Sequence, residues 1–299
     1  FGSECGEVEV LETIAETLID PLIGADIRAE LAADEGIPFA AARQRAVAKR
    51  LGEMSCQLET PNNILAVEYI KAIYNLGLNL KPVTIQRFGS GHDELSGEGY
   101  KSAAEIRRMI SGGKDIASEL PESACAVYRR EEKLGRGPVT PESLESAIIS
   151  RLRMLPDKAY AALPDTGEGL HNRIARAAKE ECSLDAILAA GKSKRYALSR
   201  IRRIIMCAAL GISAQMSAET PPYARVLAAN SRGCALLREM GEKSRIPVIT
   251  KPAEVKSCGD ECRGLFELGS AAHDLYVLGY AARGERKGGA DWRTSPKIM

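Results

Sequence analysis

The sequence predicts an α/β fold, followed by an all-α region and a small C-terminal α/β region. Three observations predict this order. A helix, a strand, a glycine-rich loop and a second helix follow one another between Pro61 and Arg107. Apolar residues then keep helical spacing from about 116 to 214, and short β-like runs return after Pro222. We therefore expect domains at 1–115, 116–214 and 215–299.

The first predicted helix begins at the asparagine pair Asn62-Asn63. An asparagine at a helix start can accept a hydrogen bond from a free backbone N–H, so either residue is a candidate N-cap. The apolar residues that follow at helical spacing are Ile64, Leu65, Val67, Ile70, Ile73 and Tyr74. Gly77 is a natural end for this helix.

A strand is predicted next, where Val83 and Ile85 alternate with Thr84 and Gln86. This strand places Arg87 at its carboxyl end. Ligands of open α/β sheets bind at the carboxyl ends of the strands. Arg87 is therefore a candidate binding residue, although a lone arginine is more often an ordinary surface residue.

A glycine-rich loop then leads to a helix that begins at Ser102. Ser102 and Glu105 have the spacing of a capping box, S-x-x-E, which leaves other backbone N–H groups free at the helix start. Free donors and the helix dipole both attract phosphate there. Arg107, one turn further on, can add a guanidinium to the same anion. The capping box by itself is more often purely structural.

The helical region is expected to include helices at 141–154 and 168–181, with Thr140 and Ser183 as plausible caps. In the last region we expect strands at 224–227 and 246–249 around a helix near 232–243. A final helix is expected at 262–279, with an apolar face of Leu265, Phe266, Leu268, Leu275 and Leu278.

Net charge is only +1, but the charge is unevenly distributed. Between Lys192 and Ser213 there are six basic residues and no acidic one: Lys192, Lys194, Arg195, Arg200, Arg202 and Arg203. On a helical wheel Leu198, Ile201, Ile204 and Ile205 share one side, and Arg195, Arg200 and Arg203 project from the other. A solvated face usually mixes both signs of charge, so this segment is a candidate surface for RNA phosphates.

Composition agrees with a cytoplasmic protein that has no membrane association. The 299 residues suffice for two or three domains, and 45% hydrophobic content suffices for their cores. No stretch approaches the roughly 18 apolar residues of a membrane span. The eight cysteines are scattered along the sequence, and residues such as Cys125 and Cys207 are expected to be reduced and buried. Cys258 and Cys262 lack a second ligand pair, so we expect no metal site.

Short motifs lie in order along nearly the whole chain. The first are Phe1-Gly2-Ser3-Glu4, Pro61-Asn62-Asn63-Ile64-Leu65, Arg87 with His92-Asp93, and Ser102-Ala103-x-x-Ile106-Arg107. The later ones are Leu120-Pro121, Thr140-Pro141-Glu142-Ser143, Glu168-Gly169-Leu170-x-x-Arg173-Ile174, Lys194-Arg195-Tyr196 with Arg200 and Arg203, and Pro222-Tyr223-x-Arg225-Val226-Leu227. Together they resemble the bacterial tRNA(Met) cytidine acetate ligase family of the nucleotidyltransferase-like superfamily.

The resemblance implies a doubly wound parallel-sheet nucleotidyltransferase-like domain and an ATP-dependent reaction. Members of the family activate acetate as acetyl-adenylate and acetylate the wobble cytidine of elongator methionine tRNA. The implied ATP contacts fall on Gly2, on Asn62-Asn63 and on Arg87, and Mg²⁺ is expected with the ATP. The implied partners are acetate and tRNA.

The resemblance also implies an amino-terminal H-x-G-H motif. The sequence has only His92, His171 and His273, at other spacings. In the family the paired histidines stabilise charge on the transferring phosphates. We therefore expect a fragment that lacks roughly a hundred upstream residues, enough for the first half of a doubly wound domain, and that is inactive alone.

Two other function classes stay open at this point. A nucleotidyltransferase acting on a small metabolite would explain the nucleotide half-site but not the helical and C-terminal regions. A non-enzymatic RNA-binding helical protein would explain the basic segment but not the series of Asn, Arg and Ser-x-x-x-Ile-Arg motifs.

Overall fold

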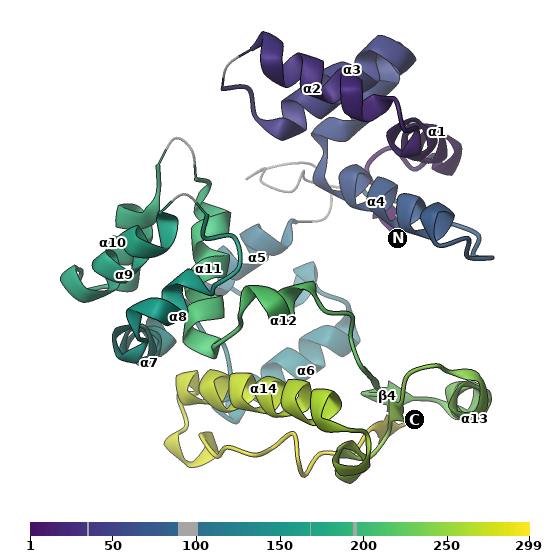
Figure 1. Cartoon of the computed structure of the whole chain (residues 1–299). Coiled ribbons are helices and arrows are strands. Elements are labelled where there is room, and N and C mark those ends of the chain that lie inside the picture. Colours follow the sequence, from purple (N-terminus) through teal and green to yellow (C-terminus); the bar gives the residue numbers. More distant parts are fainter. Residues whose placement is uncertain (35, 89–100, 168, 194–195) are drawn as a thin grey trace. The chain divides into compact units, whose positions relative to one another are not determined.

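The computed structural model describes residues 1–34, 36–88, 101–167, 169–193 and 196–299. They form two compact units, Phe1–Glu122 and Ser123–Met299 (Figure 1). Both units are largely helical and contain only short, parallel strand pairs. None of the helices described is long and apolar enough to cross a membrane. The division into three domains stays a prediction.

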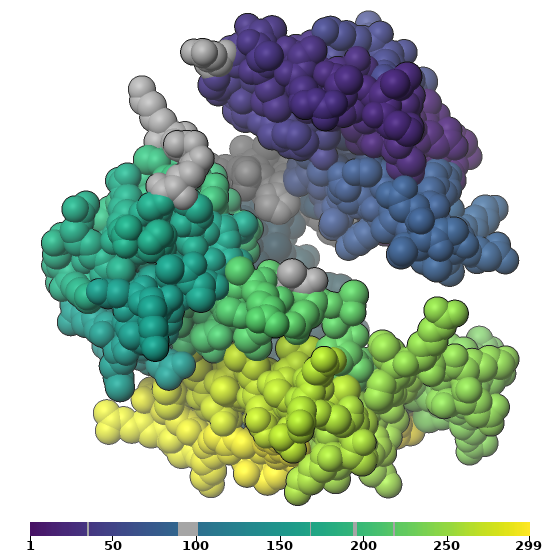
Figure 2. Space-filling view, in the orientation of Figure 1, coloured from purple at the N-terminus to yellow at the C-terminus, as the bar shows by residue number. Residues whose placement is uncertain are grey.

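Four helices make up most of the first unit. They are α1 (Val8–Ile19), α2 (Ile23–Ala33), α3 (Phe39–Leu51) and α4 (Pro61–Asn75), with a 3-10 segment, η1 (Gly52–Glu59), before α4. Leu11, Ile14, Val47 and Ile70 are fully buried where these helices meet. In the space-filling view the purple and blue side chains of this unit form one continuous body (Figure 2).

Two short strands of the first unit are paired although 81 residues lie between them in the sequence. β1 (Gly2–Ser3) runs parallel to β2 (Ile85–Gln86), with Gly2 opposite Ile85 and Ser3 opposite Gln86. The predicted strand is thus confirmed, and Arg87 follows it directly. Only this strand pair of the expected doubly wound sheet is present among the residues described in this unit.

The helix expected at Ser102 is α5 (Ala103–Ser111). Ser102 is its N-cap, because its hydroxyl accepts a hydrogen bond from the backbone N–H of Glu105 at 3.2 Å. A short 3-10 turn, η2 (Ala117–Glu119), follows. The capping prediction is therefore confirmed for this helix.

The second unit is built around a helical core. Its helices up to residue 218 are α6 (Glu122–Lys133), α7 (Pro141–Met154), α8 (Asp157–Ala161), α9 (Leu170–Glu180), α10 (Leu184–Gly191), α11 (Leu198–Leu210) and α12 (Ala214–Ala218). Leu152, Ile174, Ile187 and Ile204 are buried between α7, α9, α10 and α11. The predicted helices and the predicted caps Thr140 and Ser183 are confirmed here.

Arginines lock the ends of these helices together. Arg173 on α9 donates to the carbonyls of Ala190, at 2.6 Å, and Lys192, at 3.0 Å, which end α10. Arg153 on α7 donates to Ala178 and Glu181 at the end of α9. A guanidinium at a helix C-terminus satisfies orphan carbonyls and complements the helix dipole. Arg173, which the sequence offered only as part of a motif, therefore has a structural role.

The C-terminal part of the second unit combines short strands and two long helices. Its elements are β3 (Ala224–Arg225), β4 (Ala228–Ala229), α13 (Ser231–Lys243), β5 (Val248–Ile249), η3 (Pro252–Ser257), α14 (Asp260–Tyr276), η4 (Val277–Gly279), η5 (Arg283–Glu285) and β6 (Lys297–Ile298). β3 pairs with β5 and β4 pairs with β6, both in parallel. The strands expected at 224–227 and 246–249 are thus confirmed.

The apolar face expected for the last helix is only partly buried. Phe266 is 1% exposed and packs with Ile249, Val255 and Trp292. Leu265 and Leu278, by contrast, are 38% and 43% exposed. The expected face was therefore too wide, because the surrounding part of the chain is small and covers only one side of α14.

Candidate nucleotide site and basic face of α11

The turn between β1 and α1 is joined to the start of α4 by Glu4. Its carboxylate accepts hydrogen bonds from the backbone N–H of Asn63 at 2.9 Å, the amide Nδ2 of Asn62 at 2.5 Å and, at 3.4 Å, the backbone N–H of Asn62. Asn62 and Asn63 lie in the first turn of α4, and the N-cap is Thr60. The prediction that an asparagine caps this helix is wrong, since the orphan N–H groups are satisfied by a carboxylate distant in sequence.

Asn63 completes the same junction from the other side. Its side chain is fully buried, and its Oδ1 accepts from the backbone N–H groups of Glu4, at 2.8 Å, and Cys5, at 3.2 Å. Its Nδ2 donates to Oε1 of Gln57 at 2.9 Å. All polar atoms of the Asn63 amide are therefore engaged within the protein. Asn62 is half-buried, and among the described residues its side chain bonds only through Nδ2.

These contacts change the acidity of Glu4. Burial raises the pKa of its carboxyl group, but the hydrogen bonds from Asn62 and Asn63 outweigh burial and hold the pKa below its ordinary value. Glu4 is therefore ionised at neutral pH. The negative charge lies at the positive end of the α4 dipole, where an anion is stabilised.

Two more residues of this turn were not identified as important from the sequence. Ser3 is fully buried, and its hydroxyl contacts the Thr84 hydroxyl at 2.6 Å and accepts from the Gly6 N–H at 3.0 Å. Gly6 has φ of 71°, and a Cβ there would lie 2.8 Å from Cβ of Gln86. Only glycine fits this approach. The sequence signal was the Gly2-Ser3-Glu4 motif, but its partners lie about 60 to 80 residues away.

Arg87 lies at the carboxyl end of β2 with an exposed side chain. Its backbone N–H donates to the Ser3 carbonyl at 2.9 Å, which fixes the main chain beside β1. Its Cγ lies 3.7 Å from the position that a Cβ on Gly2 would occupy. Among the residues that the structure describes, none pairs with its guanidinium. The structure thus brings Gly2, Arg87 and the Glu4–Asn62–Asn63 junction together.

Ser102 and Arg107 belong to a separate place in the first unit. Ser102 is buried and its hydroxyl is used by the cap of α5, while Arg107 is exposed and has no ion-pair partner in the described ranges. Neither residue shares a hydrogen bond with the β1–β2 pair in the part of the chain that is described. The connecting residues 89–100, including His92 and Asp93, lie outside it.

The first-unit site can bind an anion through groups that have no partner in the described part of the chain. Arg87 offers a planar guanidinium whose donors match phosphate or carboxylate oxygens. Gly2 offers backbone without a side chain, so a ligand can approach closely. The N-terminus of α4, by contrast, already holds the Glu4 carboxylate. The candidate anion contacts therefore lie at the strand ends.

The basic face of α11 differs from its prediction in one respect. Ile201, Ile204 and Ile205 are buried as predicted. Asp165, from the loop before α9, however, binds both arginines: its carboxylate pairs with the guanidinium of Arg203, and its backbone carbonyl accepts from the guanidinium of Arg200. The expectation that no carboxylate lies near them is wrong, because Asp165 is 35 or more residues away in sequence.

Asp165 contacts the two arginines with different groups. Nε and Nη2 of Arg203 donate to its Oδ2 at 3.1 and 2.5 Å. Nε and Nη2 of Arg200 donate to its backbone carbonyl at 3.1 and 2.6 Å. The guanidinium of Arg200 also lies over the ring of Tyr196, 5.1 Å from its centroid. Tyr196 itself is buried.

Two further cations of the segment are exposed and have no ion pair with any residue described. These are Lys192, which ends α10, and Arg202 on α11. The other two predicted RNA contacts, Lys194 and Arg195, lie outside the described residues. Arg202 was part of the basic run in sequence but was not among the predicted contacts.

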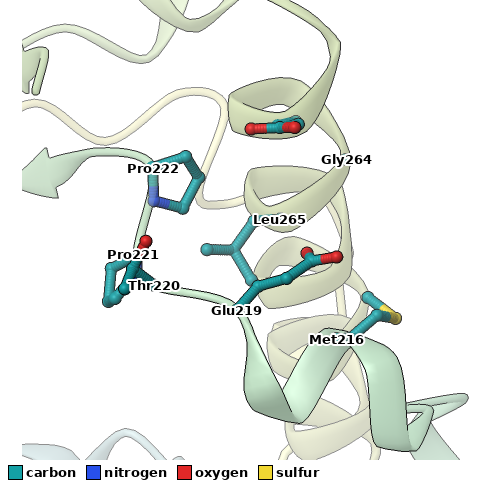
Figure 3. A pocket seen from close by; sticks show the side chains of 8 residues that line it. Met216, Glu219, Thr220, Pro221, Pro222, Gly264 and Leu265 are labelled. Carbon is teal, nitrogen blue, oxygen red and sulfur yellow. The ribbon is translucent and has the colours of Figure 1, made fainter.

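A hollow of about 740 Å³ in the second unit does not suit a nucleotide. It is lined by Met216, Glu219, Thr220, Pro221, Pro222, Glu261, Gly264 and Leu265. Figure 3 shows Leu265 of α14 pointing toward the segment that carries Pro221 and Pro222. The hollow has two carboxylates and no basic residue, so it would repel phosphate.

No group of three or more His, Cys, Asp or Glu side chains is placed to hold a metal ion within the described ranges. The Cys258 and Cys262 thiols donate instead to the carbonyls of Glu254 and Pro222, at 3.1 and 3.3 Å. Burial raises the pKa of the Cys262 thiol, which keeps it protonated.

Comparison with known proteins gives consistent results. The HIGH Nucleotidyl Transferase family model matches residues 1–291. The chain is 35% identical over 289 residues to the tRNA(Met) cytidine acetate ligase of Caldanaerobacter subterraneus subsp. tengcongensis, covering 94% of this chain and 71% of that protein. It is 30% identical over 318 residues to the ligase of the same name from Acetivibrio thermocellus, covering 100% and 76%.

Solved structures extend this similarity to the fold. The apo crystal structure of Thermotoga maritima TmcAL matches with a TM-score of 0.89 at 26% identity, covering 100% of this chain and 76% of that one. The crystal structure of the same protein bound with alpha-thio ATP matches with a TM-score of 0.88 at 25% identity, covering 100% and 75%.

Proposed function

This chain belongs to the HIGH nucleotidyl transferase family and, within it, to the tRNA(Met) cytidine acetate ligases, and we propose that it serves the ATP-dependent acetylation of a tRNA(Met) cytidine. The reaction would take place in the cytoplasm on elongator tRNA(Met), at the wobble cytidine. The partners are then ATP with Mg²⁺, acetate and tRNA.

The proposed chemistry has two steps. An acetate oxygen attacks the α-phosphorus of ATP, and pyrophosphate leaves, which gives acetyl-adenylate. The exocyclic amine of the cytidine then attacks the acetyl carbonyl, loses a proton, and AMP leaves. Both steps develop negative charge on phosphate oxygens, which positively polarised donors stabilise.

The observation that carries the nucleotide half of this proposal is the position of Arg87. Its guanidinium has no ion pair among the residues described and lies at the carboxyl end of a parallel strand beside Gly2, the edge at which α/β sheets bind ligands. We assign Arg87 to the ATP phosphates and Gly2 to a close backbone approach. The Thermotoga maritima relative of the same fold, whose structure is bound with alpha-thio ATP, supports ATP as the ligand.

We assign different roles to the two asparagines. Asn62 is half-buried and its Oδ1 accepts no hydrogen bond from any described residue, so it can contact ATP directly. Asn63 is fully buried and engaged, so it positions the β1–α4 junction on which the site depends. Ser102 and Arg107 are a second candidate phosphate contact, at the start of α5.

The RNA half of the proposal uses the basic segment from Lys192 to Arg203. Lys192 and Arg202 are exposed without a described ion pair and would contact phosphates directly. Arg200 and Arg203 add charge to α11, and we propose Lys194 and Arg195, which lie outside the described residues, as further RNA contacts. Buried isoleucines of α11 hold this face in place.

ATP binding tests the nucleotide half. Titration calorimetry of this chain with ATP and Mg²⁺ should show binding that Arg87→Ala weakens by about 1–3 kcal/mol, the range for a lost charge-assisted hydrogen bond. Arg28→Ala is the matched control, because Arg28 is an exposed arginine on α2 of the same unit. Equal affinity of the Arg87 and Arg28 variants would remove Arg87 from the site.

RNA binding tests the other half. The affinity for a tRNA(Met) transcript should fall steeply with salt, and the substitution Arg202→Gln should lower the slope by about 0.7 to 0.9. A chain that binds this RNA but shows no ATP binding at any concentration would instead favour the non-enzymatic RNA-binding function.

A further inference from the structure

Asp165 docks on the basic face of α11 in the way that a phosphate group would. Two donors of Arg203, Nε and Nη2, converge on its Oδ2. This side-on arrangement of a guanidinium is the one that also binds phosphate oxygens. The loop that carries Asp165 is held by a buried threonine, Thr166, whose hydroxyl donates to the Leu163 carbonyl at 2.8 Å.

The contact between Asp165 and Arg203 is exchangeable. The two side chains are 47% and 59% exposed. Exposed ion pairs contribute little to stability, because water and salt screen them. A nucleic acid, in contrast, presents many phosphates at once and gains free energy from the release of its condensed counterions. A nearby phosphodiester can therefore compete with this carboxylate for Arg203.

Arg200 is held by groups that do not depend on the carboxylate. It donates to the backbone carbonyl of Asp165 and lies over the ring of Tyr196. If the Asp165 side chain turned away from Arg203, both contacts could persist. Arg200 thus anchors the loop, while Arg203 is the residue that can change partner.

We propose that Arg203 is a binding site for an RNA phosphodiester group and that the Asp165 carboxylate occupies this site until RNA displaces it. The inference rests on the proposed function, because it assumes that this face of α11 contacts RNA. It adds a specific phosphate site and an internal competitor that lowers the affinity for RNA.

Asp165→Asn tests the competitor without disturbing the loop. Asp165 has φ of 59°, in the left-handed region, which asparagine tolerates as well as aspartate does. The variant keeps the side-chain shape and the backbone carbonyl that holds Arg200, while it removes the negative charge and replaces one acceptor oxygen by an amide NH2 donor. Asp157→Asn is the matched control, since Asp157 is an exposed aspartate paired with Lys179 at 2.9 Å in the same unit.

Filter binding of a tRNA(Met) transcript at several salt concentrations gives the readout. We expect Asp165→Asn to bind RNA roughly two- to fivefold more tightly than the native chain, the range that corresponds to loss of one exposed ion pair. Arg203→Gln should weaken binding and lower the salt slope by about 0.7 to 0.9. In the double variant the gain from Asp165→Asn should disappear. Asp157→Asn should show no comparable gain.

The outcomes separate this inference from the proposed function. If the native chain binds RNA, but Asp165→Asn gains no more than Asp157→Asn or keeps its gain in the Arg203→Gln background, then Asp165 does not compete for a phosphate site. If the native chain and all variants are folded, as shown by cooperative unfolding in urea, and none of them binds the transcript, then the RNA-binding function itself is wrong.

Discussion

Replacement of Asn63 by alanine should destabilise the first unit strongly. The side chain is fully buried and makes three hydrogen bonds, two accepted from the backbone N–H groups of Glu4 and Cys5 and one donated to Gln57. Alanine leaves all three partner groups unsatisfied. These groups join β1 to the start of α4, so the loss falls on the junction that supports the nucleotide site.

The expected magnitude follows from the two backbone donors. A buried donor left without a partner costs about 1–3 kcal/mol. Glu4 and Cys5 are themselves only half-buried, so water can reach part of the junction after the change. We therefore expect a total loss of about 2–4 kcal/mol from the free energy of unfolding of this unit. Asn62→Ala removes one side-chain hydrogen bond to the ionised Glu4 carboxylate at a half-buried position, and it should cost about 1.5–2 kcal/mol, the low end of the range for a charged acceptor.

Hydrogen exchange measured by mass spectrometry is the appropriate assay, because it reports each unit separately. Amides of α1 and α4 should lose protection in Asn63→Ala, and amides of α7 and α11 in the second unit should keep theirs as an internal control. Equal protection of α4 in Asn63→Ala and Asn62→Ala would refute the assigned structural role of Asn63.

Three other outcomes follow from the structure. The pKa of Glu4 is lower in the folded protein than in the unfolded chain. Its contribution to stability is therefore complete above the unfolded pKa and is lost as pH falls through the folded pKa. The free energy of unfolding, measured as pH is lowered, should show this loss in the native chain and not in Glu4→Gln. In urea unfolding, Arg173→Ala should lower the free energy of unfolding of the second unit by about 1–3 kcal/mol, because the carbonyls that end α10 lose a charged donor. The control Arg176→Ala, on the exposed side of α9, should change it by less than about 0.5 kcal/mol. Ile204→Ala should cost about 2–5 kcal/mol in the same assay, since its side chain is fully buried in the core; a loss below about 1 kcal/mol would show that this core is loosely packed.

Local sequence signals predicted many of the helices and strands after Pro61, but not the helices α1, α2 and α3 of the first unit. The predicted helix 141–154 coincides with α7, and the cap predicted at Thr140 is present. The helix near 232–243 corresponds to α13, and the β-like runs contain β3 and β5. Caps, proline positions and apolar periodicity act within one turn of the chain, so they can be identified without knowledge of the fold.

The partners of the candidate site residues could not be identified in this way. Asn62 and Asn63 looked like helix caps, and only the structure shows Glu4 binding the start of α4 from 58 residues away. The basic run looked free of carboxylates, and only the structure places Asp165 on Arg203. Nothing in the spacing of residues indicates which distant side chain will meet them.

The sequence by itself thus determined the helices and strands from Pro61 onward that carry clear caps and periodicity, the residues that carry charge, and the family that the motifs resemble, but it did not predict α1, α2 and α3. The tertiary structure decided which of those charges are already neutralised: Glu4 is engaged by α4 and Arg203 by Asp165, while Arg87 has no partner among the residues described. The physical reason is the distance along the chain over which each kind of interaction acts. Propensity and capping act between neighbours along the chain, whereas hydrogen bonds and ion pairs form between whatever groups the folded backbone brings within about 3 Å of each other.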